Sequence, residues 1–246
     1  MNLLKNVLGR ILAIWALLSF VVPMLVILIP VWLIGIMKEP KRTDVFLKLS
    51  RLWLKVFFLF SGVRRKYFGL HHFKKEATYI VVCNHSSFMD APLCSAGIPG
   101  AHKTIAKIEM SKIPLFGLIY KSGSVLVDRK NNESKKSSFL KMKEVLSLGM
   151  HMCIYPEGTR NKTDKPLQPF HDGAFKLATD TGNSIIPALI FNTKNVIPRH
   201  KLFYFWPQKI EMHFLDPVHT IVGESYQLLK ERVFTIMQDY YIRNNS

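Results

Sequence analysis

TYIVVCNHSSFMD, residues 78–90, runs from apolar residues into a histidine and an aspartate. Its first half, TYIVVC, has the length and the β-branched content of a buried strand. His85 and Asp90 lie five positions apart, and at about 100° per residue their side chains would fall on different sides of a regular helix. If the two residues work together, His85 must lie in the turn that leaves the strand and Asp90 in the first turn of a following helix. The stretch therefore predicts a strand–turn–helix unit.

The chain from residue 66 onward repeats this alternation of short apolar runs and helical patterns. We expect strands at 78–83, 102–106, 124–128, 151–155, 184–190 and 209–215. We expect helices near 89–97, 114–122, 132–148, 173–181 and 223–242. This alternation predicts an α/β fold, a mixed and at least partly parallel sheet flanked by helices. We therefore assign residues 64–246 to one α/β domain.

The N-terminal part of the chain is strongly apolar, and residues 11–37 carry no charge. A bilayer span needs about 20 such residues. Pro23 and Pro30 interrupt the run, and interior prolines break or kink helices. A segment that enters the bilayer and turns back near one of these prolines therefore fits the sequence as well as a span does.

The next segment, 44–63, places Lys48, Arg51 and Lys55 at helical spacing among apolar residues. This pattern is typical of an amphipathic helix that lies in a membrane interface. Basic residues also flank the apolar run on both sides, which favours both ends on the cytoplasmic face. We therefore expect residues 1–63 to form a one-sided, helical membrane-anchoring segment of at least two helical pieces.

The composition combines a formal net charge of +17 with 48% apolar residues. Nucleic-acid binders are basic but seldom so apolar, and no aromatic stacking platform is interleaved with the basic residues, so we expect no nucleic-acid partner. A basic, apolar chain is more typical of proteins that work at an anionic membrane surface. The three cysteines, Cys83, Cys94 and Cys153, are too widely spaced for a metal knuckle or a disulfide framework, and we interpret them as reduced core residues.

Polar residues follow four of the expected strands. They are the NHSSFMD segment, Lys107, the pair Asp128 and Arg129, and the segment PEGTR at 156–160. Ligands of open α/β sheets gather beyond the carboxyl ends of the strands. Four such clusters together predict a binding or catalytic site.

His85 has the chemistry of a general base near neutral pH, and Asp90 can fix its tautomer. No G-x-S-x-G nucleophile motif occurs, so a substrate hydroxyl is the expected proton donor. Two ligands, with no third His or Cys at ligand spacing, are too few for a metal. Lys107, Arg129 and Arg160 are suited to binding a phosphate, and Gly158 allows the backbone to approach it closely.

These residues together resemble a known family. NHSSFMD resembles the N-H-x4-D motif of the glycerolipid acyltransferases, and GSVLVDR at 123–129 is similar to their second motif. YPEGTR at 155–160 resembles the third motif, and IIPALI at 185–190 resembles the fourth. The four motifs occur in the order of the family, and the resemblance covers roughly residues 66–220. The bacterial 1-acyl-sn-glycerol-3-phosphate acyltransferases look most similar within it.

The resemblance implies acyl transfer from acyl-CoA or acyl carrier protein to the sn-2 hydroxyl of a lysophosphatidic acid, giving phosphatidic acid. It implies His85 as the base, Asp90 as its support, and Glu157 as a residue that orients the arginines or the loop. The implied substrate-binding residues are Asn84, Lys107, Arg129, Glu157, Gly158, Thr159 and Arg160. Backbone amides near the first motif are candidate donors to the oxyanion.

The resemblance also implies a location and a set of partners. No metal or organic cofactor is expected, and the partners would be the two lipid substrates, an anionic membrane and, as one possible donor, acyl carrier protein. We expect a bacterial inner-membrane protein with its catalytic domain on the cytoplasmic face. Two alternatives stay open. One is an acyltransferase for another lysolipid, such as lyso-ornithine lipid, and the other is a membrane-surface binding protein that has lost catalysis.

Overall fold

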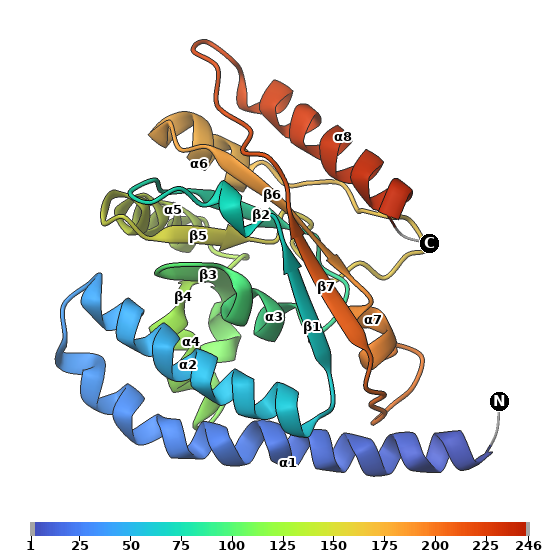
Figure 1. Cartoon of the computed structure of the whole chain (residues 1–246). Helices are drawn as coiled ribbons and strands as arrows, with labels where there is room; N and C mark the ends of the chain where they lie inside the picture. Colours follow the sequence, from blue (N-terminus) through green and yellow to red (C-terminus); the bar gives the residue numbers. More distant parts are fainter. Residues whose placement is uncertain (1–2, 245–246) are drawn as a thin grey trace.

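Residues 3–244 of the chain are described by a computed structural model, in which helices cover both faces of one sheet (Figure 1). The strands are β1 (Arg64–Phe68), β2 (Ile80–Cys83), β3 (His102–Lys107), β4 (Ser124–Val127), β5 (His151–Ile154), β6 (Ile185–Phe191) and β7 (Lys209–Phe214). The α-helices are α1 (Leu3–Leu33), α2 (Lys41–Phe60), α3 (Asp90–Gly97), α4 (Phe116–Gly123), α5 (Asn132–Ser147), α6 (Gly173–Thr181), α7 (Thr193–Val196) and α8 (Tyr226–Asn244). Three short 3-10 turns are η1 (Ile34–Ile36), η2 (Leu70–His72) and η3 (Ile108–Lys112).

The strand order β1-β7-β6-β2-β5-β3-β4 places β2 at the centre of the sheet. All neighbouring strands are parallel except β6 and β7, which are antiparallel. Val81 of β2 lies opposite Cys153 of β5 on one side and Ile186 of β6 on the other. The expected mixed, partly parallel sheet is confirmed. Because β2 to β6 run in one direction, their carboxyl ends meet at one edge, where open α/β sheets bind ligands.

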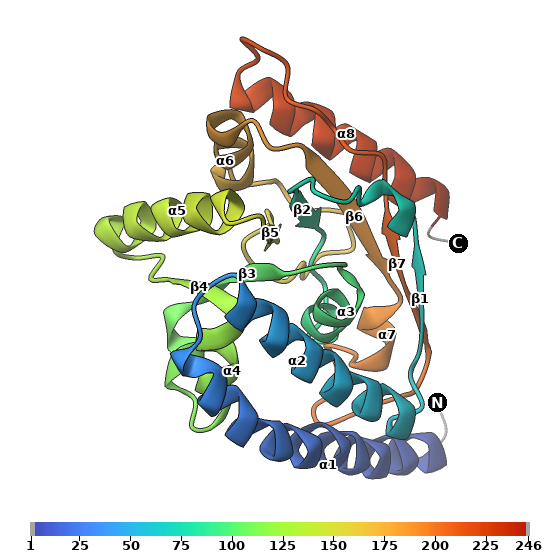
Figure 2. The same ribbon diagram turned by 60° about the vertical axis from the view of Figure 1, so that its left-hand side comes forward.

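Alternating side chains of β2 contribute to two separate hydrophobic cores. Val81 and Cys83 belong to the core that α2 and α3 close, whereas Ile80 and Val82 belong to the core closed by α5, α6 and α8. Figure 2 shows these two groups of helices on opposite sides of the sheet. Each fully buried aliphatic side chain contributes about 1.5–3 kcal/mol of hydrophobic stabilisation. Burial on both faces therefore fixes the strand that leads into His85.

The six strands and five helices expected from the sequence are present within a few residues of their predicted bounds. β1 is an additional strand at the edge of the sheet, where its residues alternate between exposed and half-buried. Its sequence, RRKYF, contains no apolar run that would indicate a strand. α7 is an additional helix of one turn, too short to show helical periodicity.

The course of α1 corrects the expectation that the chain turns near Pro23 or Pro30. Both prolines lie inside one continuous helix, and the chain turns at η1 and the residues after it. A proline inside a helix removes one hydrogen bond and bends the axis, but it need not end the helix. The turn instead occurs where the apolar run gives way to the charged segment KEPKR at 38–42. The two expected helical pieces are therefore α1 and α2.

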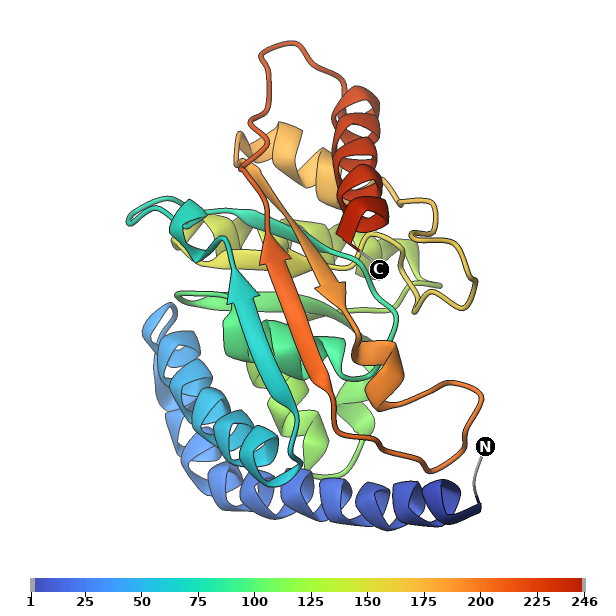
Figure 3. The ribbon, with the colours of Figure 1, turned by 45° about the vertical axis from the view of Figure 1, so that its right-hand side comes forward.

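α1 and α2 form a helical hairpin that lies against the rest of the molecule (Figures 1 and 3). Near the start of α1, the backbone amide of Phe205 donates to the carbonyl of Gly9 at 3.0 Å. Further along, the indole Nε1 of Trp53 in α2 donates to the carbonyl of Phe20 at 2.7 Å. Trp53 is buried in the same core as β2, so the expected anchor segment and the expected α/β domain share one hydrophobic core.

The outer side of α1 is apolar and exposed. Val26 is 71% exposed and Trp32 is 69% exposed. Among the described residues, Leu3–Ile36 is the one segment long and apolar enough to cross a membrane. The N-terminal helix is thus a candidate membrane anchor, with one side packed on protein and the other side available to lipid.

The turn between α1 and α2 is fixed by the carboxylate of Glu39. Its Oε1 accepts hydrogen bonds from Lys103 of β3 at 2.8 Å and from Arg42 at 2.6 Å. Its Oε2 accepts from the hydroxyl of Thr43 at 2.7 Å. Burial alone would raise the pKa of Glu39, but the hydrogen bonds from Lys103, Thr43 and Arg42 outweigh it and lower the pKa to about 2. These contacts tie the hairpin to the sheet.

We predict that Glu39→Gln lowers the free energy of unfolding by about 1–3 kcal/mol at pH 7, because charge-assisted hydrogen bonds are lost. The pKa of Glu39 falls from 4.5 to about 2 on folding, so this stabilisation is present above pH 4.5 and is lost as the pH falls toward 2. Denaturant unfolding in detergent at pH 7 and pH 3 measures it, with Glu133→Gln on the exposed side of α5 as the control. An equal difference at both pH values would contradict the ionic role of Glu39.

Candidate active site

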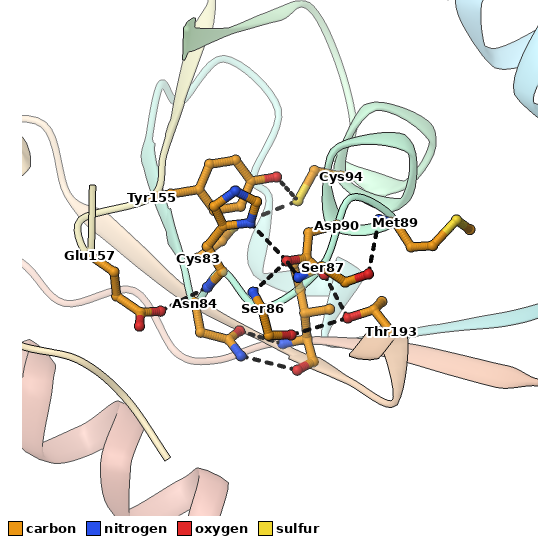
Figure 4. Close-up of polar contacts among 12 residues, drawn as sticks. Cys83, Asn84, Ser86, Ser87, Met89, Asp90, Cys94, Tyr155, Glu157 and Thr193 are labelled. Atoms are coloured by element: carbon orange, nitrogen blue, oxygen red, sulfur yellow. Dashed lines mark hydrogen bonds and ion pairs between the residues drawn. The ribbon is translucent and has the colours of Figure 1, made fainter. Parts of the chain in front are cut away.

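The carboxylate of Asp90 lies at the start of α3 and is fully buried. Its Oδ2 accepts hydrogen bonds from His85 Nδ1 at 2.8 Å and from the backbone amides of Ser86 at 2.7 Å and Ser87 at 2.8 Å. Its Oδ1 accepts from the hydroxyl of Thr193 at 2.6 Å (Figure 4). A carboxylate can be buried at low cost only when it is hydrogen-bonded in this way. The turn after β2 is thereby held in the shape that joins His85 to Asp90.

His85 is enclosed by the segment that follows β5. The ring of Tyr155 stacks on the imidazole with the ring centroids 4.3 Å apart. The carboxylate of Glu157 accepts from the backbone amide of His85 at 2.7 Å, and the amide of Asn161 donates to its carbonyl at 2.6 Å. Because Nδ1 is bonded to Asp90, Nε2 is the ring nitrogen left for chemistry, and within residues 3–244 it has no hydrogen-bond partner. Nε2 is therefore available as a base.

Asn84 positions the strand end from which His85 projects. Its side-chain Nδ2 donates to the carbonyl of Ile190 at 3.1 Å, and its Oδ1 accepts from the amide of the same residue at 2.7 Å. The side chain is buried, and the amide group matches both partners at once. Since both of its polar groups are engaged within the protein, we assign Asn84 to the support of His85.

Glu157 is buried beneath the same turn. Its second oxygen, Oε2, accepts from the backbone amide of Gln168 at 2.9 Å. Burial raises the pKa of Glu157, although the hydrogen bonds from the amides of His85 and Gln168 oppose that rise. Of the two roles expected for Glu157, orienting the arginines or orienting the loop, these contacts support the second.

Backbone amides near the first motif were the expected candidate donors to the oxyanion. The amide of His85 donates to Glu157, and the amides of Ser86 and Ser87 donate to Asp90. All three donors are therefore occupied by carboxylates. These three amides are not available to an oxyanion, so the expectation stays with the other backbone amides near the motif.

Three basic residues expected to bind phosphate, Lys107, Arg129 and Arg160, follow strands at the same edge of the sheet, and we call them the basic edge. Lys107 ends β3 opposite Val127, two residues before Arg129. Arg129 Nη1 donates to the carbonyl of Gly158. The Arg160 guanidinium lies over the ring of Phe88 in the first motif, 3.6 Å from the ring centroid. The second motif thus contacts the third directly, and the third contacts the first.

Gly158 permits this close packing. Its φ is +69°, and a Cβ at this position would lie 2.7 Å from the ring of His171. Any other residue would combine backbone strain with a clash. The neighbouring Thr159 is exposed.

The three cysteines are widely spaced in the sequence but form a cluster in the folded chain. Cys83, Cys94 and Cys153 are buried and free, as expected of reduced core residues. Their sulfur atoms, however, all lie within 4.8 Å of one another. Converging thiols are soft-metal ligands, so the argument from spacing against a metal at these residues does not hold in the folded chain. The hydroxyl of Tyr155 donates to the sulfur of Cys94 at 3.2 Å, which links the cluster to the ring beside His85 (Figure 4).

Two residues of the site, Thr193 and Tyr155, were not among the site residues expected from the sequence. Thr193 follows β6 by two positions and Tyr155 follows β5 directly. Thr193 belongs to no local pattern that indicates chemistry, and Tyr155 begins the third motif but was given no role of its own. Their position just after a strand of the parallel sheet was the available signal.

Comparison with known proteins places this geometry in a family. The sequence profile of the family described as Acyltransferase matches residues 64–191, which contain His85, Asp90 and the basic edge. The chain belongs to the acyltransferase family. The expectation drawn from the four motifs is thereby confirmed.

The relatives of this acyltransferase include bacterial and animal proteins. This chain is 24% identical over 196 residues to the 1-acyl-sn-glycerol-3-phosphate acyltransferase of Borreliella burgdorferi. The match covers 79% of this chain and 77% of that protein. The chain is 30% identical over 176 residues to 1-acyl-sn-glycerol-3-phosphate acyltransferase alpha of Mus musculus. That match covers 71% of this chain but only 61% of the mouse protein.

A solved structure resembles this acyltransferase over nearly its whole length. It is the crystal structure of the 1-acyl-sn-glycerophosphate acyltransferase PlsC from Thermotoga maritima. The TM-score is 0.81, the identity is 23%, and the match covers 97% of each chain. At this identity the likeness establishes the fold.

Proposed function

We propose that this acyltransferase moves an acyl chain from acyl-CoA or acyl carrier protein to the sn-2 hydroxyl of 1-acyl-sn-glycerol-3-phosphate, giving phosphatidic acid. The observation that carries the proposal is the 2.8 Å contact between His85 Nδ1 and the buried carboxylate of Asp90. The names of the relatives from Borreliella burgdorferi and Mus musculus support this choice of acceptor. The proposed reaction moves one proton and one acyl group and requires no cofactor.

The proposed chemistry follows from the tautomer that Asp90 selects. With Nδ1 protonated, Nε2 of His85 removes the proton from the sn-2 hydroxyl as its oxygen attacks the thioester carbonyl carbon. The tetrahedral intermediate collapses, the carbon–sulfur bond breaks, and His85 returns the proton to the departing thiolate. The buried carboxylate of Asp90 stabilises the imidazolium that exists between these two proton transfers.

The basic edge is proposed to bind the phosphate of the acceptor. Arg129 and Arg160 can each form two parallel hydrogen bonds to phosphate oxygens, and Lys107 adds a point charge. Arg129 is connected to the third motif through Gly158. Binding of phosphate at this edge would therefore be coupled to the segment that encloses His85.

We predict that His85→Ala lowers acceptor-dependent thiol release from palmitoyl-CoA by about 10²- to 10⁴-fold, the usual cost of removing a general base. The assay uses purified protein in detergent with 1-acyl-sn-glycerol-3-phosphate. His71→Ala, at an exposed histidine on η2, is the matched control and should keep full activity. Retention of more than about a tenth of the wild-type rate by His85→Ala would remove His85 from the base role.

We predict that Arg129→Ala and Arg160→Ala each raise the acceptor KM by about 10- to 100-fold, because charge-assisted hydrogen bonds to phosphate are lost. Lysine at either position should restore part of the loss, since an ammonium lacks the planar fork. Arg64→Ala, on the exposed edge strand β1, serves as the control. Wild-type turnover of a phosphate-free acceptor such as lyso-ornithine lipid should be slow. An unchanged acceptor KM in both alanine variants would refute the phosphate role.

We propose that α1 and α2 anchor the enzyme on one side of the bacterial inner membrane, with the active site on the cytoplasmic face. Gly9 near one end of α1 is bonded to the Phe205 backbone, and Phe20 in its middle is bonded to Trp53. A spanning α1 would have to give up these contacts. An interfacial α1 keeps them and places its exposed apolar side among lipid chains.

We predict that cysteines introduced at Leu4 and at Lys41 react with an impermeant maleimide only after the cells are opened. The one-sided anchor keeps both ends of α1 on the cytoplasmic face. The unmodified protein is the control, because its own three thiols are buried. Labelling of Leu4→Cys in intact cells would indicate a spanning helix and contradict the one-sided anchor.

A further inference from the structure

A cavity of about 640 Å³ opens beside His85, which is one of its lining residues. Its walls come from the loop that follows the third motif, residues 161–166, and from the segment 194–201 after β6. Lys5 of α1 and Trp206 also line it. None of the three residues of the basic edge is among the lining residues. The cavity volume is in the range of sites that bind small molecules.

The lining of this cavity is strongly basic. Six lysine and arginine side chains face it, namely Lys5, Lys162, Lys165, Lys194, Arg199 and Lys201. The acidic side chains in the lining are Asp164, which is exposed, and Glu157, whose oxygens accept from two backbone amides. The cavity therefore has a large excess of positive charge next to the base, which favours an anionic ligand.

Contacts within the lining hold several of these cations in place. Arg199 Nη1 donates to the carbonyl of Lys162, which joins the two loops. The ammonium of Lys201 lies 4.0 Å from the centroid of the Tyr204 ring. The ammonium of Lys5 lies 5.0 Å from the centroid of the Trp206 ring. The cavity is thus built jointly by the anchor helix and the catalytic domain.

The proposed reaction brings two anionic substrates to one histidine. The acceptor carries a phosphate, and both thioester donors carry their acyl chain on a phosphopantetheine arm. Like charges repel, so the two phosphates need separate sites within reach of the reacting atoms. Two basic places are candidates, the basic edge and the cavity that His85 itself lines. One anion site is therefore left after the acceptor phosphate is assigned to the basic edge.

We propose that the basic cavity binds the phosphate-bearing end of the thioester donor. This inference rests on the proposed function. The pantetheine arm then leads from the cavity to His85, and its thioester carbonyl meets the acceptor hydroxyl at Nε2. The phosphate of the arm is common to CoA and acyl carrier protein, so one cavity serves either donor.

The test replaces Lys162, Lys194 and Arg199 by alanine, singly and together, and measures KM for each substrate. The donors are palmitoyl-CoA, palmitoyl-acyl carrier protein and the phosphate-free palmitoyl-N-acetylcysteamine thioester. We expect each single change to raise the KM of a phosphate-bearing donor by about 5- to 30-fold, as for other charge-assisted contacts. The acceptor KM and the turnover of the phosphate-free donor should stay unchanged. Lys141→Ala, at an exposed lysine of α5, is the matched control.

The two phosphate-bearing donors distinguish the source of the ligand. A larger rise in KM for palmitoyl-CoA supports the proposal and indicates that the cavity also binds the nucleotide of CoA. A larger rise in KM for palmitoyl-acyl carrier protein supports the proposal and indicates that the cavity also contacts the acidic carrier. A rise in acceptor KM with an unchanged donor KM would overturn the proposal. An equal loss of activity with the phosphate-free donor would also overturn it.

A binding measurement separates this inference from the proposed function. Calorimetric titration of CoA into His85→Ala protein reports the cavity without any turnover. We expect CoA affinity to fall by about 5- to 30-fold when Lys194→Ala is added. Unchanged CoA affinity would overturn the cavity assignment and leave the acyl transfer untouched. Failure of the wild-type protein to acylate 1-acyl-sn-glycerol-3-phosphate would instead count against the proposed function.

Discussion

The buried carboxylate of Asp90 holds two separate strand ends in one arrangement. Three of its hydrogen bonds come from His85, Ser86 and Ser87 in the turn after β2, and the fourth comes from Thr193 after β6. Loss of any one partner would leave a buried acceptor short of a donor, at a cost of about 1–3 kcal/mol. The direction of the imidazole is therefore determined by the folding of the whole turn.

The parallel part of the sheet makes this arrangement possible. β2, β5 and β6 lead to the same edge, so residues far apart in the chain reach His85 within a few positions of a strand end. The segment after β5 contributes Tyr155, Glu157 and Asn161 around the histidine. The helical hairpin is tied to the neighbouring β3 through Glu39, so the candidate membrane anchor and the sheet edge that carries His85 belong to one packed body.

Local signals in the sequence predicted most of the fold and part of the site. The strands have apolar runs and the helices have helical periodicity. The five-residue spacing of His85 and Asp90 allows the two side chains to meet only in a strand–turn–helix unit. Contacts between distant segments left no such signal. Thr193 looks like any threonine after a strand, and the cysteine cluster appears only when β2, α3 and β5 come together. The prolines of α1 were misjudged because packing along the hairpin can stabilise a kinked helix that the isolated sequence would break.

The central claim is that Asp90 fixes the tautomer of His85 for proton transfer. The most direct test is steady-state kinetics of Asp90→Asn, with thermal unfolding to verify that the variant is folded. Asparagine keeps the size of the side chain but removes its charge and can select the wrong tautomer. The account predicts that kcat falls by about 10²- to 10⁴-fold while the acceptor KM changes by less than about threefold. A folded variant with a wild-type kcat and a raised acceptor KM would contradict it, because Asp90 would then act in binding alone.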